Sequence, residues 1–143
     1  MQDYRKLRVW DKAHTLALAI RRVTRAFPRS GYSSLRTQMV RAAESVVLNI
    51  VEGCGSRTSK DFARFLDIAV KSTMEVEVQL DLAKGHGVLP ERHWETLTIE
   101  AVDTRRMLGG LRARVLGLHR ESSAVQAEPT SGDGGVTQPE PEK

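Results

Sequence analysis

Apolar side chains recur along the first 120 residues at alternating spacings of three and four. This spacing is typical of amphipathic helices that pack lengthwise against one another. It predicts helices over about residues 9–27, 34–53, 59–85 and 90–119, and no strand pattern occurs between them. Four helices joined by short loops predict an all-α fold, an antiparallel up-down-up-down four-helix bundle that forms one domain over residues 1–120.

Short polar residues and glycines mark the expected ends of these helices. Ser33 or Ser34 is expected to cap the second helix, because a short hydroxyl side chain accepts a hydrogen bond from a free backbone N–H of the first turn. Gly53 is expected to end the second helix in a left-handed conformation. Thr58 or Ser59 is expected to cap the third helix, and the turn at 85–87 to stop it.

The second predicted helix carries two apolar stripes, whereas a surface helix usually carries one. The first stripe contains Leu35, Met39, Ala42, Val46, Asn49 and Gly53, and the second contains Val40, Ala43, Val47 and Ile50. Either the helix lies centrally in the domain, or a neighbouring subunit covers its second side. We favour an assembly of identical chains, with Val40, Ala43, Val47 and Ile50 as candidate interface residues.

The charge is distributed unevenly along the chain. Residues 1–120 hold 21 Lys and Arg against 13 Asp and Glu, whereas residues 121–143 hold one Lys against five acids. The last segment has three prolines, three glycines and no aromatic residue, which predicts a disordered acidic tail. A basic body favours a polyanionic partner.

Location and cofactors are constrained mainly by what the sequence lacks. It has no apolar run of the roughly 20 residues that a membrane span needs, no secretory signal and a single cysteine, Cys54, so we expect a cytoplasmic protein. The Asp11–His14 pair is the nearest match to a metal-binding helix motif, and it occurs once. There is no phosphate-binding glycine loop. We therefore expect neither a metal nor a cofactor.

Polar residues lie close to the apolar seams of the second and third helices. They are Asn49, Glu52, Ser72, Glu75 and Gln79. One interpretation is a hydrogen-bonded network that fixes how the helices align. The other is an enzyme that uses Glu52 and Glu75 as an acid–base pair. We favour the structural network, because no nucleophile or histidine accompanies the carboxylates, and we expect no enzymatic activity.

A set of short motifs gives the chain a family resemblance over about residues 4–118. The set includes Leu7-x-Val9-Trp10, Arg41-Ala42-Ala43-x-Ser45, Asn49-Ile50-x-Glu52-Gly53, Phe65-Leu66-x-Ile68-Ala69 and Ser72-x-x-Glu75. It resembles the four-helix-bundle family of the 23S rRNA intervening-sequence proteins. The resemblance implies a ring-like homopentamer without established enzymatic activity. It also implies possible partners, because a related bundle in diversity-generating retroelements binds nucleic acid and a reverse transcriptase.

Basic residues gather at the end of the predicted bundle that holds the N-terminal arm, the turn between the second and third helices, and the end of the fourth helix. They are Arg5, Lys6, Arg8, Arg57, Lys60, Arg64, Arg112, Arg114 and Arg120. We expect them to bind RNA or DNA through its backbone, with low sequence specificity. The acidic tail is a hypothetical competitor for this surface. The alternative is a protein-interaction scaffold that does not bind nucleic acid.

Overall fold

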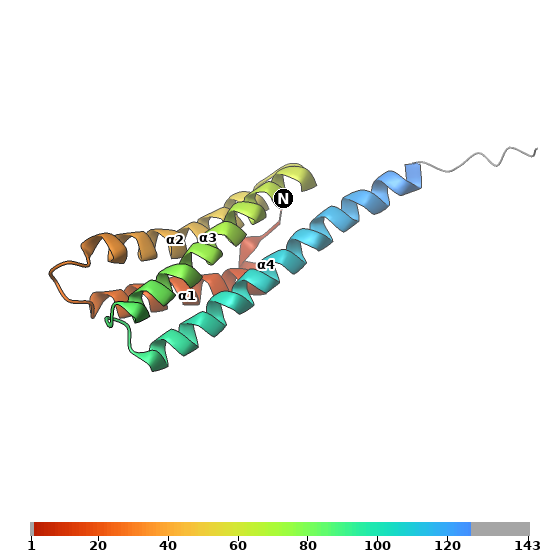
Figure 1. Ribbon diagram of the computed structural model, residues 1–143. Helices are drawn as coiled ribbons and strands as arrows, with labels where there is room; N and C mark the ends of the chain where they lie inside the picture. The colour runs from red at the N-terminus through yellow and green to blue at the C-terminus, as the bar shows by residue number, and fades with distance from the viewer. Residues whose placement is uncertain (1, 127–143) are drawn as a thin grey trace, which may run out of the picture.

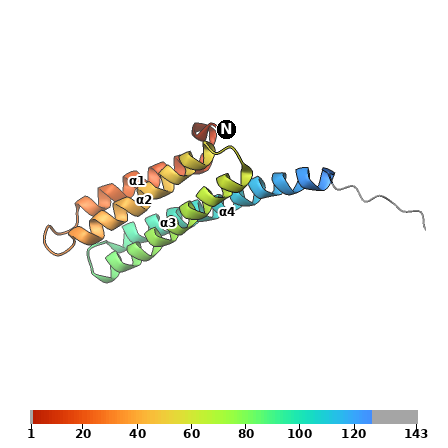
Figure 2. The same cartoon turned by 90° about the horizontal axis from the view of Figure 1, so that it is seen from above.

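The computed structural model describes residues 2–126, with side chains as far as residue 117. A short 3-10 helix, η1 (Tyr4–Lys6), precedes four α-helices, which are α1 (Arg8–Arg25), α2 (Ser33–Cys54), α3 (Ser59–Gly85) and α4 (Glu91–Gln126). The described residues contain no strand. Successive helices lie side by side and turn back at alternate ends (Figure 1; Figure 2). The predicted all-α four-helix bundle is confirmed.

The fourth helix is longer than the sequence pattern predicts. It continues to Gln126 instead of ending near residue 119, and its last part extends past the other three helices (Figure 1). The predicted boundary between the bundle and the acidic tail at residue 120 was therefore wrong, because residues 121–126 belong to α4. The rest of the predicted disordered tail, 127–143, lies outside the described residues. None of the described helices combines the length and apolarity needed to cross a membrane.

Two of the predicted helix ends have the expected geometry. The Thr58 side chain accepts a hydrogen bond of 3.1 Å from the backbone N–H of Asp61 at the start of α3. Just after α3, Gly87 has a φ of 76°, a left-handed conformation that favours glycine. At the start of α2 the expectation was wrong, because Tyr32 is the capping position, its side chain makes no capping bond, and Ser33 is already helical.

Gly53 does not end α2 in the predicted left-handed conformation. It lies inside the helix, which continues to Cys54. A Cβ atom at this position would lie 3.2 Å from the ring of Phe62 and 3.3 Å from the Cβ of Phe65, both on α3. Glycine at this position therefore allows α2 and α3 to approach each other closely, and a larger residue would require Phe62 and Phe65 to shift slightly.

The hydrophobic core has two parts, one towards each end of the bundle. One includes Leu16, Ile20, Met39 and Leu80, and the other includes Val9, Ile50, Leu66 and Leu108.

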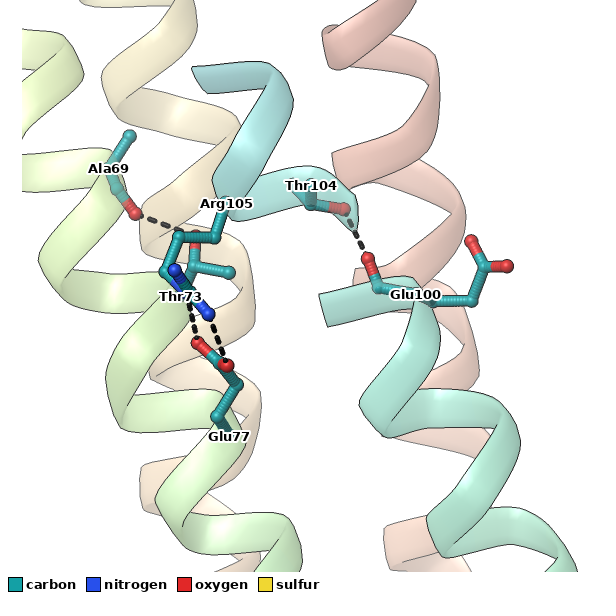
Figure 3. A network of polar contacts seen from close by, with 6 residues as sticks. All are labelled: Ala69, Thr73, Glu77, Glu100, Thr104 and Arg105. Carbon is teal, nitrogen blue, oxygen red and sulfur yellow. Dashed lines mark hydrogen bonds and ion pairs between the residues drawn. The ribbon is translucent and has the colours of Figure 1, made fainter. Parts of the chain in front are cut away.

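Buried threonines lie between the two parts of the core. Thr73 donates a hydrogen bond of 2.8 Å to the carbonyl oxygen of Ala69, and Thr104 donates one of 2.7 Å to that of Glu100 (Figure 3). Each hydroxyl group is satisfied by its own helix, so neither leaves an unpaired donor in the core.

The second apolar stripe of α2 lies inside the protomer, and the predicted subunit interface is wrong for two of its residues. Ala43 and Ile50 are 1% and 0% exposed in the single chain. Val47 packs against the core, and Val40 is half-buried beside Thr24 of α1. The second stripe is therefore covered within the protomer, where α2 packs against both α1 and α3. The sequence periodicity correctly indicated that α2 is covered on two faces. It could not indicate which neighbouring element covers each face.

Candidate nucleic-acid interface

Backbone hydrogen bonds bring the N-terminal arm against the end of α2. The N–H of Gln2 donates to the carbonyl oxygen of Cys54 at 3.0 Å, and that of Leu7 donates to Tyr4 at the same distance. The Asp3 carboxylate caps η1 by accepting a bond of 3.1 Å from the N–H of Arg5. The arm and the α2–α3 turn thus lie at the same end of the molecule, which we call the basic end.

Most of the predicted binding residues at the basic end are exposed and are not in ion pairs. This group comprises Arg5, Lys6, Arg8, Arg57, Lys60 and Arg114, and no carboxylate of the described residues forms a salt bridge with any of them. Two predicted residues differ. Arg112 pairs with Asp67, and Arg64 lies 3.9 Å from Asp61, with its guanidinium 4.4 Å from the centre of the Phe65 ring. The side chain of Arg120 lies outside the described part of the chain.

A groove of about 570 Å³ runs between the start of α1 and α4 at the basic end. Its polar lining consists of Lys6, Arg8 and Arg114, and its apolar lining includes Leu7, Val9, Met107 and Leu111. We call this feature the α1/α4 groove. The groove combines positive charge with apolar surface. It can therefore accept a polymer that has a negatively charged backbone and less polar side groups.

Three aromatic rings lie beside the cations of the basic end, and none of them was among the binding residues predicted from the sequence. The Tyr4 and Trp10 rings are 5.2 Å apart, and Trp10 stacks on His14 at 5.0 Å with an angle of 7° between the planes. The Arg5 guanidinium lies 4.9 Å from the centre of the Tyr4 ring. The i, i+4 spacing of Trp10 and His14 on a helix was the available signal. These rings contact one another and leave less of their faces for stacking on bases.

Two glycines of α4 are exposed and have no close neighbours. Gly109 and Gly110 are exposed, and a Cβ atom at either would have no neighbour within 4 Å. They therefore do not mediate a close helix contact within the described chain. The helix runs through both positions without interruption.

The predicted polar network is only partly assembled, and its centre is Ser45, which was not among the predicted residues. The Ser45 and Ser72 hydroxyl groups are 2.9 Å apart, and the Asn49 amide donates to the Ser45 carbonyl and hydroxyl oxygens at 2.8 and 3.1 Å. The buried Oε1 atom of Gln79 has no partner among the described residues. The Ser45–Ser72 contact joins α2 to α3 and fixes their relative alignment.

The structure does not bring Glu52 and Glu75 together. Both are exposed and lie on opposite sides of the Ser45–Ser72 contact. Glu52 is seven residues beyond Ser45 towards the start of α3, and Glu75 is three residues beyond Ser72 in the opposite direction. At 1.5 Å per helical residue their positions differ by about 15 Å along the bundle. This separation is too large for the two carboxylates to act on one proton.

The single cysteine of the sequence, Cys54, lies at this end of the molecule. Cys54 is buried, and burial, followed by the nearby charge of Asp3, raises the pKa of its thiol. The raised pKa disfavours the nucleophilic thiolate. Among the described residues, no group of three or more His, Cys, Asp or Glu side chains is arranged to hold a metal ion.

Residues 5–110 match the family described as 23S rRNA-intervening sequence protein. The match covers most of the chain. The chain belongs to this family. The match includes Arg5, Lys6 and Arg8 and stops before Leu111. Part of the α4 wall of the groove, including Arg114, and the acidic segment therefore lie outside the part that defines the family.

The fold of the chain is also similar to a solved crystal structure. That structure is of a protein of unknown function from the S23 ribosomal protein family of Bacteroides thetaiotaomicron. The sequences are 22% identical, the alignment covers 73% of this chain and 97% of the other, and the TM-score is 0.69. At this identity the similarity shows the shared fold alone. A search of curated proteins found no match.

Proposed function

We propose that this chain is a non-enzymatic, homo-oligomeric four-helix bundle that binds nucleic acid through its basic end with low sequence specificity. The observation that carries the proposal is the group of exposed cations at that end without carboxylate partners among the described residues, from Arg5 and Lys6 on the arm to Arg57 on the turn and Arg114 on α4. Phosphate groups can replace the water around these cations without first breaking an ion pair.

The binding mode follows from the side chains available. Arginine and lysine contact phosphate oxygens, and such contacts position a protein on nucleic acid without reading its sequence. The aromatic rings of Tyr4, Trp10 and His14 already contact one another, so stacking on bases contributes less than charge. Affinity should therefore depend steeply on salt and only weakly on base sequence.

Oligomerisation is supported by an apolar stripe on the outer face of α3. Met74, Val78 and Leu82 follow one another at four-residue intervals and are 52%, 58% and 49% exposed. We call these residues the α3 stripe, and we propose that a second copy of the chain covers it. The family resemblance supports five copies in a ring, which would repeat the basic end on every subunit and strengthen its field.

The test of nucleic-acid binding is a salt titration with single-stranded and duplex RNA and DNA of several sequences. We expect log Kd to rise with log salt, with a slope of about 0.9 for each phosphate neutralised on duplex. The variant Arg8→Glu/Arg114→Glu should weaken binding by about 100-fold at low salt and reduce the slope by about 2.

The matched control for that variant reverses two exposed arginines of α1 at the opposite end, Arg22→Glu/Arg25→Glu. These substitutions change the net charge equally but leave the groove intact, so affinity should fall by less than about threefold. Equal losses from both variants would mean that total charge, rather than the basic end, determines binding. The absence of salt-dependent binding by the parent chain would exclude the proposal.

The second candidate function is a scaffold for a protein partner, such as a reverse transcriptase, that does not bind nucleic acid. The exposed α3 stripe favours it, because an apolar surface can bind a different protein as well as a second copy. Light scattering distinguishes these occupants. If copies cover the stripe, Val78→Glu/Leu82→Glu should dissociate the assembly, whereas Leu18→Glu/Ile99→Glu, at separate exposed sites, should not. An assembly unchanged by the α3 variant would place the subunit interface elsewhere and favour a different partner on the stripe.

A further inference from the structure

The acidic segment at the end of the chain is negatively charged, which makes it complementary to the positively charged basic end. Residues 127–143 contain Glu128, Asp133, Glu140 and Glu142 against a single cation, Lys143. They contain no aromatic side chain and little apolar surface. The contribution of this segment to binding is therefore electrostatic, and its natural counterpart is a cluster of cations without carboxylate partners.

The described helix that leads into this segment also lines a groove with such cations. α4 forms one wall of the α1/α4 groove through Gly110, Leu111 and Arg114, and the same helix leads into the acidic segment after Gln126. From Arg114 to Gln126 the helix rises about 18 Å. An extended chain over residues 127–143 reaches about 55 Å at 3.3 Å per residue. The segment is therefore long enough to return along α4 to the groove with residues to spare.

We propose that the acidic segment 127–143 docks in the α1/α4 groove of its own chain, with its carboxylates on Lys6, Arg8 and Arg114. Tethering favours this occupant over any separate polyanion of similar charge, because a segment joined to the groove by a short connection has an effective concentration of the order of millimolar. The apolar lining of Leu7, Val9 and Met107 accommodates the prolines and the valine between the acidic residues.

Docking has a regulatory consequence, which rests on the proposed function. The segment and a nucleic-acid backbone require the same three cations, so each excludes the other from the groove. Nucleic acid must therefore displace the segment before it can use the whole basic end. The segment raises the concentration of nucleic acid needed for binding, and it discriminates most strongly against short or weakly charged strands.

The first test detects docking without nucleic acid. A zero-length carbodiimide reagent joins lysine amines to neighbouring carboxylates in the full chain, and mass spectrometry locates the links. Lys6 should be joined to carboxylates of residues 127–143. Lys84, which lies 3.6 Å from Glu91, is the internal positive control, and the exposed Lys71 on α3 is the control for random encounters.

Mixing isotopically heavy and light chains shows which chain provides the segment. Links within chains of one mass support the proposal, and links between heavy and light chains overturn docking in its own chain. Recovery of the Lys84–Glu91 link, together with no more tail links at Lys6 than at Lys71, overturns docking altogether.

The second test measures competition in the full-length chain. Replacing Glu128, Glu140 and Glu142 by Gln and Asp133 by Asn should tighten nucleic-acid binding by about three- to tenfold at low salt. The gain should shrink as salt screens both interactions. The matched control, Thr130→Ala/Ser131→Ala, changes the same segment without changing its charge and should leave affinity unaltered.

The two tests separate failure of this inference from failure of the proposed function. If nucleic acid does not bind but Lys6 is joined to the segment within one chain, the proposed function fails and docking stands. If nucleic acid binds with the expected salt dependence, but neutralising the segment changes nothing and Lys6 gives no specific links, this inference is overturned and the proposed function stands.

Discussion

The two ends of the bundle differ in how several of their positively charged side chains are used. At the end where α1 joins α2 and α3 joins α4, which we call the loop end, several of them stabilise the fold. Arg36 donates to the carbonyl oxygens of Thr24, Phe27 and Pro28 at 3.0, 3.2 and 3.1 Å. At the basic end, Arg5, Lys6 and Arg8 make no ion pair with a described carboxylate.

A second cation at the loop end, Lys84, is also held by contacts within the fold. The Lys84 amine lies 3.6 Å from the centre of the Trp94 ring and 3.6 Å from a Glu91 carboxylate oxygen. The Trp94 N–H in turn donates to Asp81 at 2.8 Å. A count of charges along the sequence treats such cations and those of the groove alike. The comparison shows that the cations available to a ligand are those that the fold has not already used.

The largest expected effect on stability comes from Arg36→Met. The substitution removes the hydrogen bonds that satisfy three carbonyl oxygens around the end of α1, and bonds of this kind to a charged donor each contribute about 1.5–3 kcal/mol. We expect the free energy of unfolding to fall by about 2–3 kcal/mol in urea denaturation, since water reaches some of these oxygens in the variant.

The corresponding change at the basic end is Arg8→Met, which removes an exposed cation that is unpaired within the described chain. It should change the free energy of unfolding by less than about 0.5 kcal/mol. Similar losses in the two variants would contradict the division between a structural and a binding end. Arg36→Lys should recover little, because an ammonium group cannot donate in the fork geometry of a guanidinium.

The contrast between Arg36 and Arg8 shows what the sequence could predict. Apolar periodicity predicted the bundle and the buried positions of residues such as Leu16 and Leu80, because repeats of three and four follow directly from helix geometry. It could not predict the role of Arg36, which depends on how α1 and α2 meet. It likewise assigned the Ala43–Ile50 stripe to another subunit because periodicity reveals a face but not its neighbour.

The candidate site was predictable in outline for the same reason. Helix order alone placed the arm, the α2–α3 turn and the end of α4 at one end of the molecule. Which cations are paired depends on side-chain geometry across helices, so the Arg112–Asp67 pair and the α1/α4 groove were not visible. The α3 stripe escaped notice because Met74, Val78 and Leu82 lie off the apolar seam that defines the helix.

Gly53→Ala tests how closely the helices are packed at the basic end. The new Cβ atom would lie 3.2 Å from the Phe62 ring and 3.3 Å from the Cβ of Phe65, so the packing of α2 on α3 must adjust by a few tenths of an ångström. We expect a loss of about 1–2 kcal/mol in thermal or urea denaturation, which is typical of overpacking. Gly109→Ala, on the open face of α4, should instead add about 0.5–1 kcal/mol through helix propensity.

A gain in stability from both glycine variants would show that α2 and α3 are less closely packed than the structure indicates. A loss from both would show that α4 requires glycine at position 109 for a contact made by another molecule, and light scattering of Gly109→Ala would then reveal a change in assembly.

The two tryptophans provide a smaller test, because one lies at each end. Trp94→Phe removes a hydrogen bond to Asp81 and should cost about 1 kcal/mol. The buried Nε1 atom of Trp10 has no acceptor among the described residues. Trp10→Phe therefore removes an unsatisfied donor, and this gain offsets part of the lost packing. A larger loss at Trp10 than at Trp94 would mean that an acceptor outside the described residues satisfies its N–H group.

The smallest expected effect lies between the two ends, where Lys12 of α1 joins α4. Its amine donates to Glu100 at 2.9 Å and lies 3.6 Å from Asp103. The hydrogen bond to Glu100 and the charges of both carboxylates raise the pKa of Lys12, against the opposing effect of burial. Because the folded state holds this proton more tightly, the stabilisation is fully present below the unfolded pKa of about 10.5 and is lost as pH rises through the folded value.

Urea denaturation of the parent chain and Lys12→Met measures this contribution. The pair is partly exposed, so the difference near neutral pH should be only about 0.5–1 kcal/mol. It should persist to about pH 10 and shrink above it. The control Lys71→Met, which removes an exposed lysine with no pair among the described residues, should change the free energy of unfolding by less than about 0.5 kcal/mol near neutral pH. A difference that vanished between about pH 7 and 9 would mean that an ionisable group other than Lys12 stabilises the contact between α1 and α4.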